Sequence, residues 1–124
     1  MDLNRFSFEE LEVWQKAVEF TRIVLEVSES IGARNKHYRL IEQLESASSS
    51  IALNIAEGKG RYSKKEFIHY LYVARGSLFE TITLLLILGR SRIVTEAKIE
   101  EMKNRSFEIG KMLSGLINSI KTQL

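Results

Sequence analysis

The stretch NIAEGKGRYSKKEF, residues 54–67, is where one apolar helical pattern stops and the next begins. Gly58 is the residue type that ends many helices in a left-handed conformation. Ser63, with Glu66 three residues later, has the spacing of a capping box that starts a helix. The G-K-G-R run lacks the spacing of a phosphate-binding P-loop, and no strand precedes it. We therefore interpret the stretch as a helix–turn–helix joint.

Outward from this joint, apolar residues recur at spacings of three and four, which is typical of helices that bury one face. The pattern predicts helices over 8–32, 38–58, 64–89 and 96–121. The sequence contains no proline, a residue that breaks helix interiors. Short links between helices place consecutive helices antiparallel. Residues 1–124 are therefore predicted to form a single all-α domain, an antiparallel up-down-up-down four-helix bundle.

Three further residues are expected to mark helix ends. Ser7 and Thr95 are candidate N-caps, and Gly32 is a candidate C-terminal stop. If the second and third helices are antiparallel and joined by the turn after Gly58, small residues of the two helices lie opposite each other. We therefore expect these two helices to approach closely. The small residues are Ser46, Ser48, Ser49 and Ser50 on one side and Ala74, Gly76 and Ser77 on the other. The same argument applied to the first turn brings Trp14 near Glu57.

The composition excludes several classes of protein. The chain has no cysteine, so it has no disulfide framework, and this is compatible with a reducing cytosol. The N-terminus carries four acids in its first twelve residues and no apolar core segment, so we expect no signal peptide. The apolar run 82–88 is too short to span a bilayer. We expect a cytoplasmic protein without a membrane partner.

Charge is unevenly distributed although the net charge is only +2. Residues 1–33 hold three cations and seven acids, residues 34–66 hold seven and four, and residues 67–124 hold eight and five. In the predicted topology the cations gather at the two ends of the bundle. One end would carry Arg34, Lys36, Arg39, Arg90 and Arg92, and the other Lys59, Arg61, Lys64 and Lys65. Such ends could bind phosphates, or they could simply be solvated turns.

Candidates for other chemistry are few. Asn54 and Glu57 lie one turn apart on the same helix. Glu57 could be a general acid or base with a pKa raised by Trp14, or the two residues could form a buried polar clasp with Arg61. His37 and His69 are the only histidines and lie in no metal-ligand spacing, so we expect no metal, no cofactor and no small-molecule substrate.

Four stretches of the sequence resemble a known family. They are FEELEVWQKA (8–17), YRLIEQLESASSSIALNIAEGKGRYSKKEF (38–67), VARGSLFET (73–81) and IGKMLSGLI (109–117). They are similar to the four-helix-bundle proteins encoded by intervening sequences in bacterial 23S ribosomal RNA genes and, more remotely, to the accessory proteins of diversity-generating retroelements. The signature residues that match are Trp14, Asn54, Glu57, Gly58, Gly60, Arg61, Ser77 and Glu80. The sequence departs from the family at IGARNKHY (31–38) and GRSRIV (89–94), where it adds cations.

The resemblance implies a four-helix bundle that assembles into a homopentamer, with no established catalytic role for any signature residue. The remote relatives imply nucleic acid and a reverse transcriptase as partners. We therefore expect a non-enzymatic oligomer that binds RNA or a ribonucleoprotein through its basic ends. The alternatives are a protein–protein scaffold or accessory protein without direct nucleic-acid binding, and an enzyme centred on Glu57.

Overall fold

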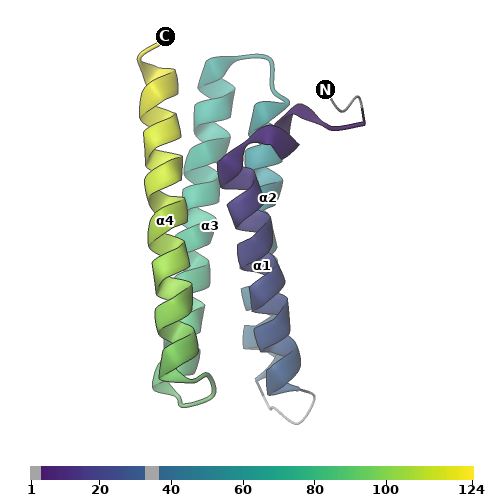
Figure 1. Ribbon diagram of the computed structural model, residues 1–124, viewed down its shortest axis with the longest axis vertical. Coiled ribbons are helices and arrows are strands. Elements are labelled where there is room, and N and C mark those ends of the chain that lie inside the picture. The colour runs from purple at the N-terminus through teal and green to yellow at the C-terminus, as the bar shows by residue number, and fades with distance from the viewer. Residues whose placement is uncertain (1–3, 33–36) are drawn as a thin grey trace.

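The structure, a computed structural model, describes residues 4–32 and 37–124. A short 3-10 helix, η1 (Ser7–Glu10), is followed by α1 (Glu12–Ile31), α2 (Tyr38–Lys59), α3 (Lys64–Arg90) and α4 (Glu96–Lys121). The four long helices run alternately up and down (Figure 1), and the described residues contain no strand. The all-α four-helix fold predicted from the sequence is confirmed.

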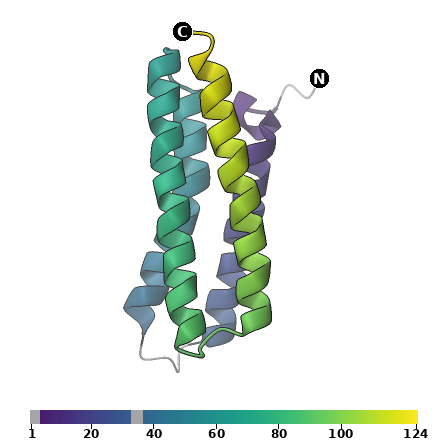
Figure 2. The ribbon, with the colours of Figure 1, turned by 90° about the vertical axis from the view of Figure 1, so that its left-hand side faces the viewer.

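The four helices lie side by side with their long axes nearly parallel (Figures 1 and 2). The α2–α3 turn, the start of α1 and the C-terminus of the chain lie at one end, and the α3–α4 turn lies at the other end with the C-terminus of α1 and the N-terminus of α2 (Figure 1). We call these the α2–α3 end and the α3–α4 end. The contacts are densest between α2 and α3 and sparsest between α1 and α4.

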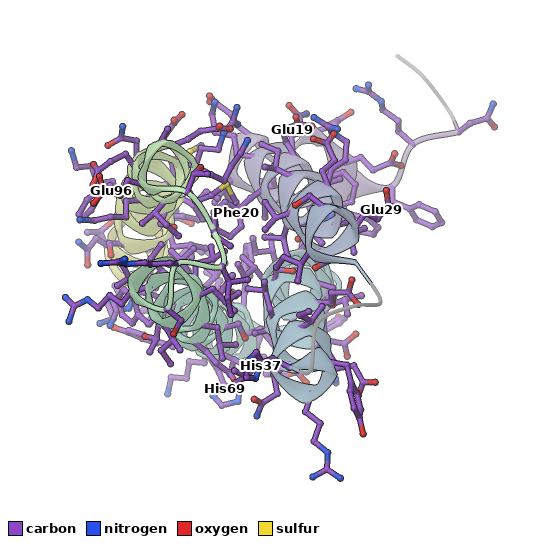
Figure 3. The ribbon with its side chains drawn as sticks, turned by 90° about the horizontal axis from the view of Figure 1, so that it is seen from below. Glu19, Phe20, Glu29, His37, His69 and Glu96 are labelled. Carbon is purple, nitrogen blue, oxygen red and sulfur yellow. The ribbon has the colours of Figure 1, made fainter. Side chains whose placement is uncertain are left out.

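The core fills the space between the four helices with aliphatic side chains and one phenylalanine. Viewed along the bundle, Phe20 points into the centre, whereas Glu19 and Glu96 lie outside (Figure 3). Each fully buried side chain of this size stabilises the fold by about 1.5–3 kcal/mol relative to exposure. The largest buried side chains are Phe20, Leu44, Ile51, Ile55, Leu71, Leu78, Leu85, Leu88, Met102, Ile109, Leu113 and Ile117.

Three predicted helix ends are confirmed. The Ser63 hydroxyl accepts a hydrogen bond from the Glu66 backbone N–H at 3.1 Å, and the Thr95 hydroxyl accepts one from the Lys98 N–H at 3.3 Å. These bonds satisfy N–H groups that would otherwise have no partner at the start of α3 and α4. Gly32 ends α1 with φ +71°, a backbone conformation that favours glycine.

The prediction that Gly58 ends the second helix is wrong. Gly58 is buried inside α2, and the helix continues through Lys59 to a cap at Gly60, whose φ of −80° is ordinary. A Cβ on Gly58 would lie 2.7 Å from Tyr70 Cβ and 3.0 Å from Phe67 Cδ1. Gly58 is therefore needed because α3 passes closely over it.

The prediction that Ser7 caps a helix from residue 8 is also wrong. The Glu9 carboxylate accepts a hydrogen bond from the Phe6 backbone N–H at 2.7 Å, which closes η1 as a separate turn. Leu11 then adopts an extended conformation and precedes α1, which begins at Glu12. The Phe8 ring lies 5.2 Å from Trp14, so η1 folds back onto α1.

Small residues do bring α2 and α3 together. The Ser50 and Ser77 hydroxyls lie 2.8 Å apart across the seam between these helices. Ser48 takes a different part, because its backbone carbonyl accepts a hydrogen bond from Thr21 of α1 at 2.9 Å. Only part of the predicted serine face therefore meets α3.

By length and apolar composition alone, α3 could cross a membrane, and 33% of its most apolar window is buried in the bundle. The core helix of a soluble protein passes the same test, so this is weak evidence. The absence of a membrane partner stays a prediction.

Candidate nucleic-acid interface

The cations predicted to gather at the ends are exposed where the structure describes them. Lys59, Arg61, Lys64 and Lys65 surround the α2–α3 turn, and Arg39, Arg90 and Arg92 lie at the α3–α4 end. These two groups are at opposite ends of the bundle (Figure 1). Arg34 and Lys36 lie outside the described residues.

Arg61 is held in place at the α2–α3 end. Its guanidinium donates hydrogen bonds to the Glu57 carboxylate and to the Tyr70 hydroxyl, the latter at 2.7 Å, and it lies 5.0 Å from the centre of the Tyr70 ring. The hydrogen bond to the Glu57 carboxylate is the main cause that raises the pKa of Arg61 above its ordinary value. Arg61 therefore braces the turn, while the three lysines carry the charge that is available to a ligand.

A pocket of about 320 Å³ opens beside the same turn. Its apolar lining comes from the start of α1, from α3 and from the last turns of α4, and its polar lining comes mainly from the turn itself. The lining residues are Leu11, Lys59, Arg61, Tyr62, Ser63, Lys64, Phe67, Leu116, Ile120 and Gln123. Among the residues that the structure describes, the lining includes three cations, two aromatic residues and no carboxylate. The Lys59 ammonium lies 5.8 Å from the centre of the Phe67 ring, so charge and aromatic surface adjoin.

The pocket at the α3–α4 end differs in chemistry. It is larger, about 810 Å³, and its cations are Arg90, Arg92 and Lys103. Glu96 and Glu100 also line it, and the Lys103 ammonium lies 3.8 Å from the Glu100 carboxylate. No aromatic residue lines this pocket. Carboxylates in the lining oppose the binding of an anion, so the α2–α3 end is the better candidate.

The model of the 23S rRNA-intervening sequence protein family matches residues 9–115, which is most of the chain. The chain belongs to this family. It is also similar to the solved structure of a protein of unknown function from the S23 ribosomal protein family of Bacteroides thetaiotaomicron, with a TM-score of 0.81 and 28% identity. The similarity covers 86% of this chain and 95% of that protein. No curated protein matches the chain significantly.

Several residues that the sequence resemblance singled out have packing roles here. The Asn54 amide donates to the Ser50 carbonyl at 2.8 Å and to the Ser50 hydroxyl at 2.9 Å, and Ser50 in turn contacts Ser77. The Asn54 bonds hold Ser50 in place within α2, and the bond between Ser50 and Ser77 joins α2 to the middle of α3. Gly58 permits the close crossing at the end of the same seam. Asn54, Ser77 and Gly58 therefore help to set the packing of α2 against α3.

The structure does not form the predicted buried clasp of Asn54 and Glu57. Asn54 is directed to Ser50, whereas the Glu57 side chain is 53% exposed and pairs with Arg61. The two side chains have different partners because Asn54 lies at the α2–α3 seam and Glu57 faces the turn. Trp14 instead lines a groove with Leu53 and other residues of α1 and α2, a groove that Glu57 does not line.

The two histidines do not form a shared site. His69 is exposed and lies edge-on to Tyr70 at 5.4 Å. His37 precedes the start of α2, at the α3–α4 end, whereas His69 lies near the start of α3, at the α2–α3 end. Within residues 4–32 and 37–124, no three potential ligands among His, Asp and Glu gather at one point.

Exposed apolar residues form two surfaces that periodicity alone does not delimit. The apolar groove is a depression of about 460 Å³ between α1 and α2, lined mainly by Phe8, Trp14, Val18, Leu25 and Leu53. The outer stripe is the exposed line of α3 that contains Val73, Gly76, Phe79, Glu80 and Ile87. The sequence indicates these two surfaces only in that Leu53 and Phe79 lie outside the main apolar rows of their helices.

Proposed function

We propose that the chain is a homo-oligomeric, non-enzymatic bundle that binds RNA, free or within a ribonucleoprotein, through its α2–α3 end. The observation that carries the proposal is the pocket beside the turn, where three cations and two aromatic side chains meet and no carboxylate of residues 4–32 or 37–124 lines the wall. The family description supports the choice of ligand, because it associates these proteins with intervening sequences of 23S rRNA.

Electrostatic attraction between exposed lysines and phosphates supports RNA as the ligand. RNA carries a high density of phosphate charge, and lysines that displace its counterions gain affinity. Lys59, Lys64 and Lys65 are exposed within seven residues of one another. Because Arg61 takes up the Glu57 charge, it leaves less opposing charge beside these lysines.

The exposed apolar surfaces support an oligomer. Phe79 is 57% exposed and Leu53 is 66% exposed, although both lie in the middle of long helices. Such surfaces are usually covered by another protein surface. The groove on α1 and α2 and the exposed stripe on α3 are two different surfaces of the bundle, which suits head-to-tail contacts that close into a ring. We propose the homopentamer that the family resemblance implies.

A non-enzymatic role fits what surrounds Glu57. This carboxylate is more than half exposed and is paired with a guanidinium. A general acid or base needs a position from which it can reach a substrate. Glu57 is instead held by Arg61 at the end of a helix, so we assign it to the bracing of the turn.

Filter binding at several salt concentrations tests the RNA proposal. We expect micromolar or tighter binding at low salt, with the logarithm of the association constant falling by about 0.7 for each phosphate contact on a single strand per unit of log salt. A total lack of binding at low salt would contradict the proposal. If the oligomer persists in that case, the scaffold function becomes the better explanation.

Light scattering tests the assembly. A homopentamer has a mass of about 72 kDa, five times the 14.3 kDa of the chain. Gly76 and Gly115 are both exposed glycines in helix interiors with no atom within 4 Å of an added Cβ, and only Gly76 lies in the outer stripe. We expect Gly76→Trp to dissociate the oligomer and Gly115→Trp to leave it intact. A wild-type chain that remains a 14.3 kDa monomer at micromolar concentration would refute the oligomer.

A further inference from the structure

We propose that the pocket beside the α2–α3 turn binds one unpaired nucleotide, so that this end of the protein selects single-stranded RNA over duplex RNA. The inference rests on the proposed function, since it specifies the form of RNA that the same end binds. It follows from the size and lining of the pocket, from the exposure of Tyr62 on a braced turn and from the chemistry of a base outside a helix.

The pocket combines two kinds of surface that a nucleotide needs. Leu11, Leu116 and Ile120 supply an aliphatic wall, and Phe67 adds an aromatic ring. Lys59 and Lys64 lie on the same lining. A flat apolar base with a phosphate attached matches an apolar hollow with ammonium groups beside it. The volume of about 320 Å³ is near the lower limit for small-ligand pockets, about 300 Å³, which suits one base rather than a stacked pair.

Tyr62 adds a second aromatic surface on a braced stretch of backbone. Its side chain is fully exposed, yet its neighbours on both sides are anchored. The Arg61 backbone N–H donates to the Gly58 carbonyl at 3.1 Å, and the Ser63 hydroxyl caps α3. Because the backbone of this turn is already ordered, stacking a base on the ring does not require the loop to be ordered as well. Stacked aromatic residues next to cations are typical of single-strand binding sites.

Duplex RNA cannot use such a pocket. Its bases are stacked on one another and present only their edges in the grooves, whereas an unpaired base can turn outward and place its face against an aromatic ring. The lysines would still attract a duplex through its phosphates. The pocket and Tyr62 therefore determine selectivity for the single strand, and the lysines contribute affinity for either form.

The lining also predicts a low preference for base sequence. Beyond the cations, its side-chain hydrogen-bonding groups are those of Gln123, Ser63 and Tyr62. The Ser63 oxygen already accepts the Glu66 N–H. Discrimination among bases needs several well-placed donors and acceptors on the base edge. Stacking on an aromatic ring, in contrast, tolerates every base.

Fluorescence anisotropy with one labelled RNA strand, alone and annealed to its complement, tests the inference. We expect the wild-type protein to bind the single strand at least about tenfold more tightly than the duplex. Tyr62→Ala should weaken single-strand binding by about tenfold, the size typical for removal of a stacking aromatic residue, and leave duplex binding unchanged. Tyr62→Phe keeps the ring and should retain wild-type affinity.

Tyr38→Ala is the matched control, because Tyr38 is also an exposed tyrosine beside a cation, Arg39, but at the opposite end of the bundle. It should leave both affinities unchanged. Equal binding of strand and duplex, or a Tyr62→Ala protein with full single-strand affinity, would overturn the inference and leave the RNA proposal standing. Failure to bind either RNA at low salt would overturn both. Because Tyr62 is fully exposed, its substitution leaves the core intact.

Discussion

The two ends of the bundle look alike in sequence and differ in structure. Each end gathers several lysines and arginines at a turn between helices. At the α2–α3 end, the pocket is lined by cations and aromatic rings, and the nearby Glu57 is paired with Arg61. At the α3–α4 end, Glu96 and Glu100 share the pocket with the cations.

The difference shows that a count of cations does not define an anion site. What matters is where the carboxylates lie and whether the cations are already paired. Lys103, for example, lies 3.8 Å from the Glu100 carboxylate, so part of its charge is compensated. The aromatic residues at the α2–α3 end also give it a surface that can bind a ligand by stacking as well as by charge.

The largest effect is expected from a glycine at each end. Gly58→Ala should lower the free energy of unfolding by about 2 kcal/mol, because the new Cβ would lie 2.7 Å from Tyr70 Cβ, an atom bonded to the backbone of α3. Gly89→Ala meets Ile99 Cγ1 at the same distance, but a small change of the Ile99 χ1 angle moves that atom, whereas Tyr70 Cβ moves only with the backbone. The higher helix propensity of alanine offsets about 1 kcal/mol at each position. We therefore expect a loss below about 1 kcal/mol for Gly89→Ala.

Urea denaturation measures both changes. Gly60→Ala is a suitable control, since its nearest atoms would lie at 3.6 Å and its φ is ordinary. Equal losses at Gly58 and Gly89 would contradict the view that the α2–α3 crossing is the less adaptable of the two.

The next effect concerns charge at the two ends. Lys59→Glu with Lys64→Glu should weaken RNA binding by about tenfold or more at low salt and reduce the salt dependence, because two phosphate contacts are lost. Arg39→Glu with Arg90→Glu changes the net charge equally and should weaken binding by less than about threefold. Filter binding compares the two proteins, with circular dichroism to check their helix content. The same loss in both would show that only net charge matters.

The smallest effect is expected at Glu57. Glu57→Gln removes the partner of Arg61 in an exposed pair, so the thermal midpoint should change by no more than about 3 °C. RNA affinity should rise slightly, because a negative charge near the lysines disappears. Thermal denaturation and filter binding check both statements. A clear loss of RNA affinity would show that the Glu57–Arg61 brace positions the binding surface.

Much of the fold follows from local rules that act along the chain. The helix end at Gly32 and the helix starts at Ser63 and Thr95 were predictable, because capping depends on residue type and on spacing within one helix. Gly58 was assigned the wrong role, since its requirement comes from Tyr70 and Phe67 of the next helix, which local rules do not consider. η1 was missed because the bond from Phe6 to Glu9 competes with a capping box at Ser7.

The candidate site was predictable only in part. The lysines around the turn were named from the sequence, because a turn in a four-helix bundle lies at an end. The pocket was not, since its walls combine Leu11, Phe67 and Leu116, which come from three separate helical regions. The separation of Asn54 from Glu57 was also missed, because a shared helix face does not fix which neighbour each side chain contacts.

The sequence by itself determined four amphipathic helices, their order and the gathering of cations at both ends, because periodicity, caps and short links act locally. Tertiary structure decided which helices cross most closely, which charges are compensated and where an apolar hollow lies beside lysines. Those features depend on distances between residues that are far apart in the chain, and such distances are set only when the four helices have packed together.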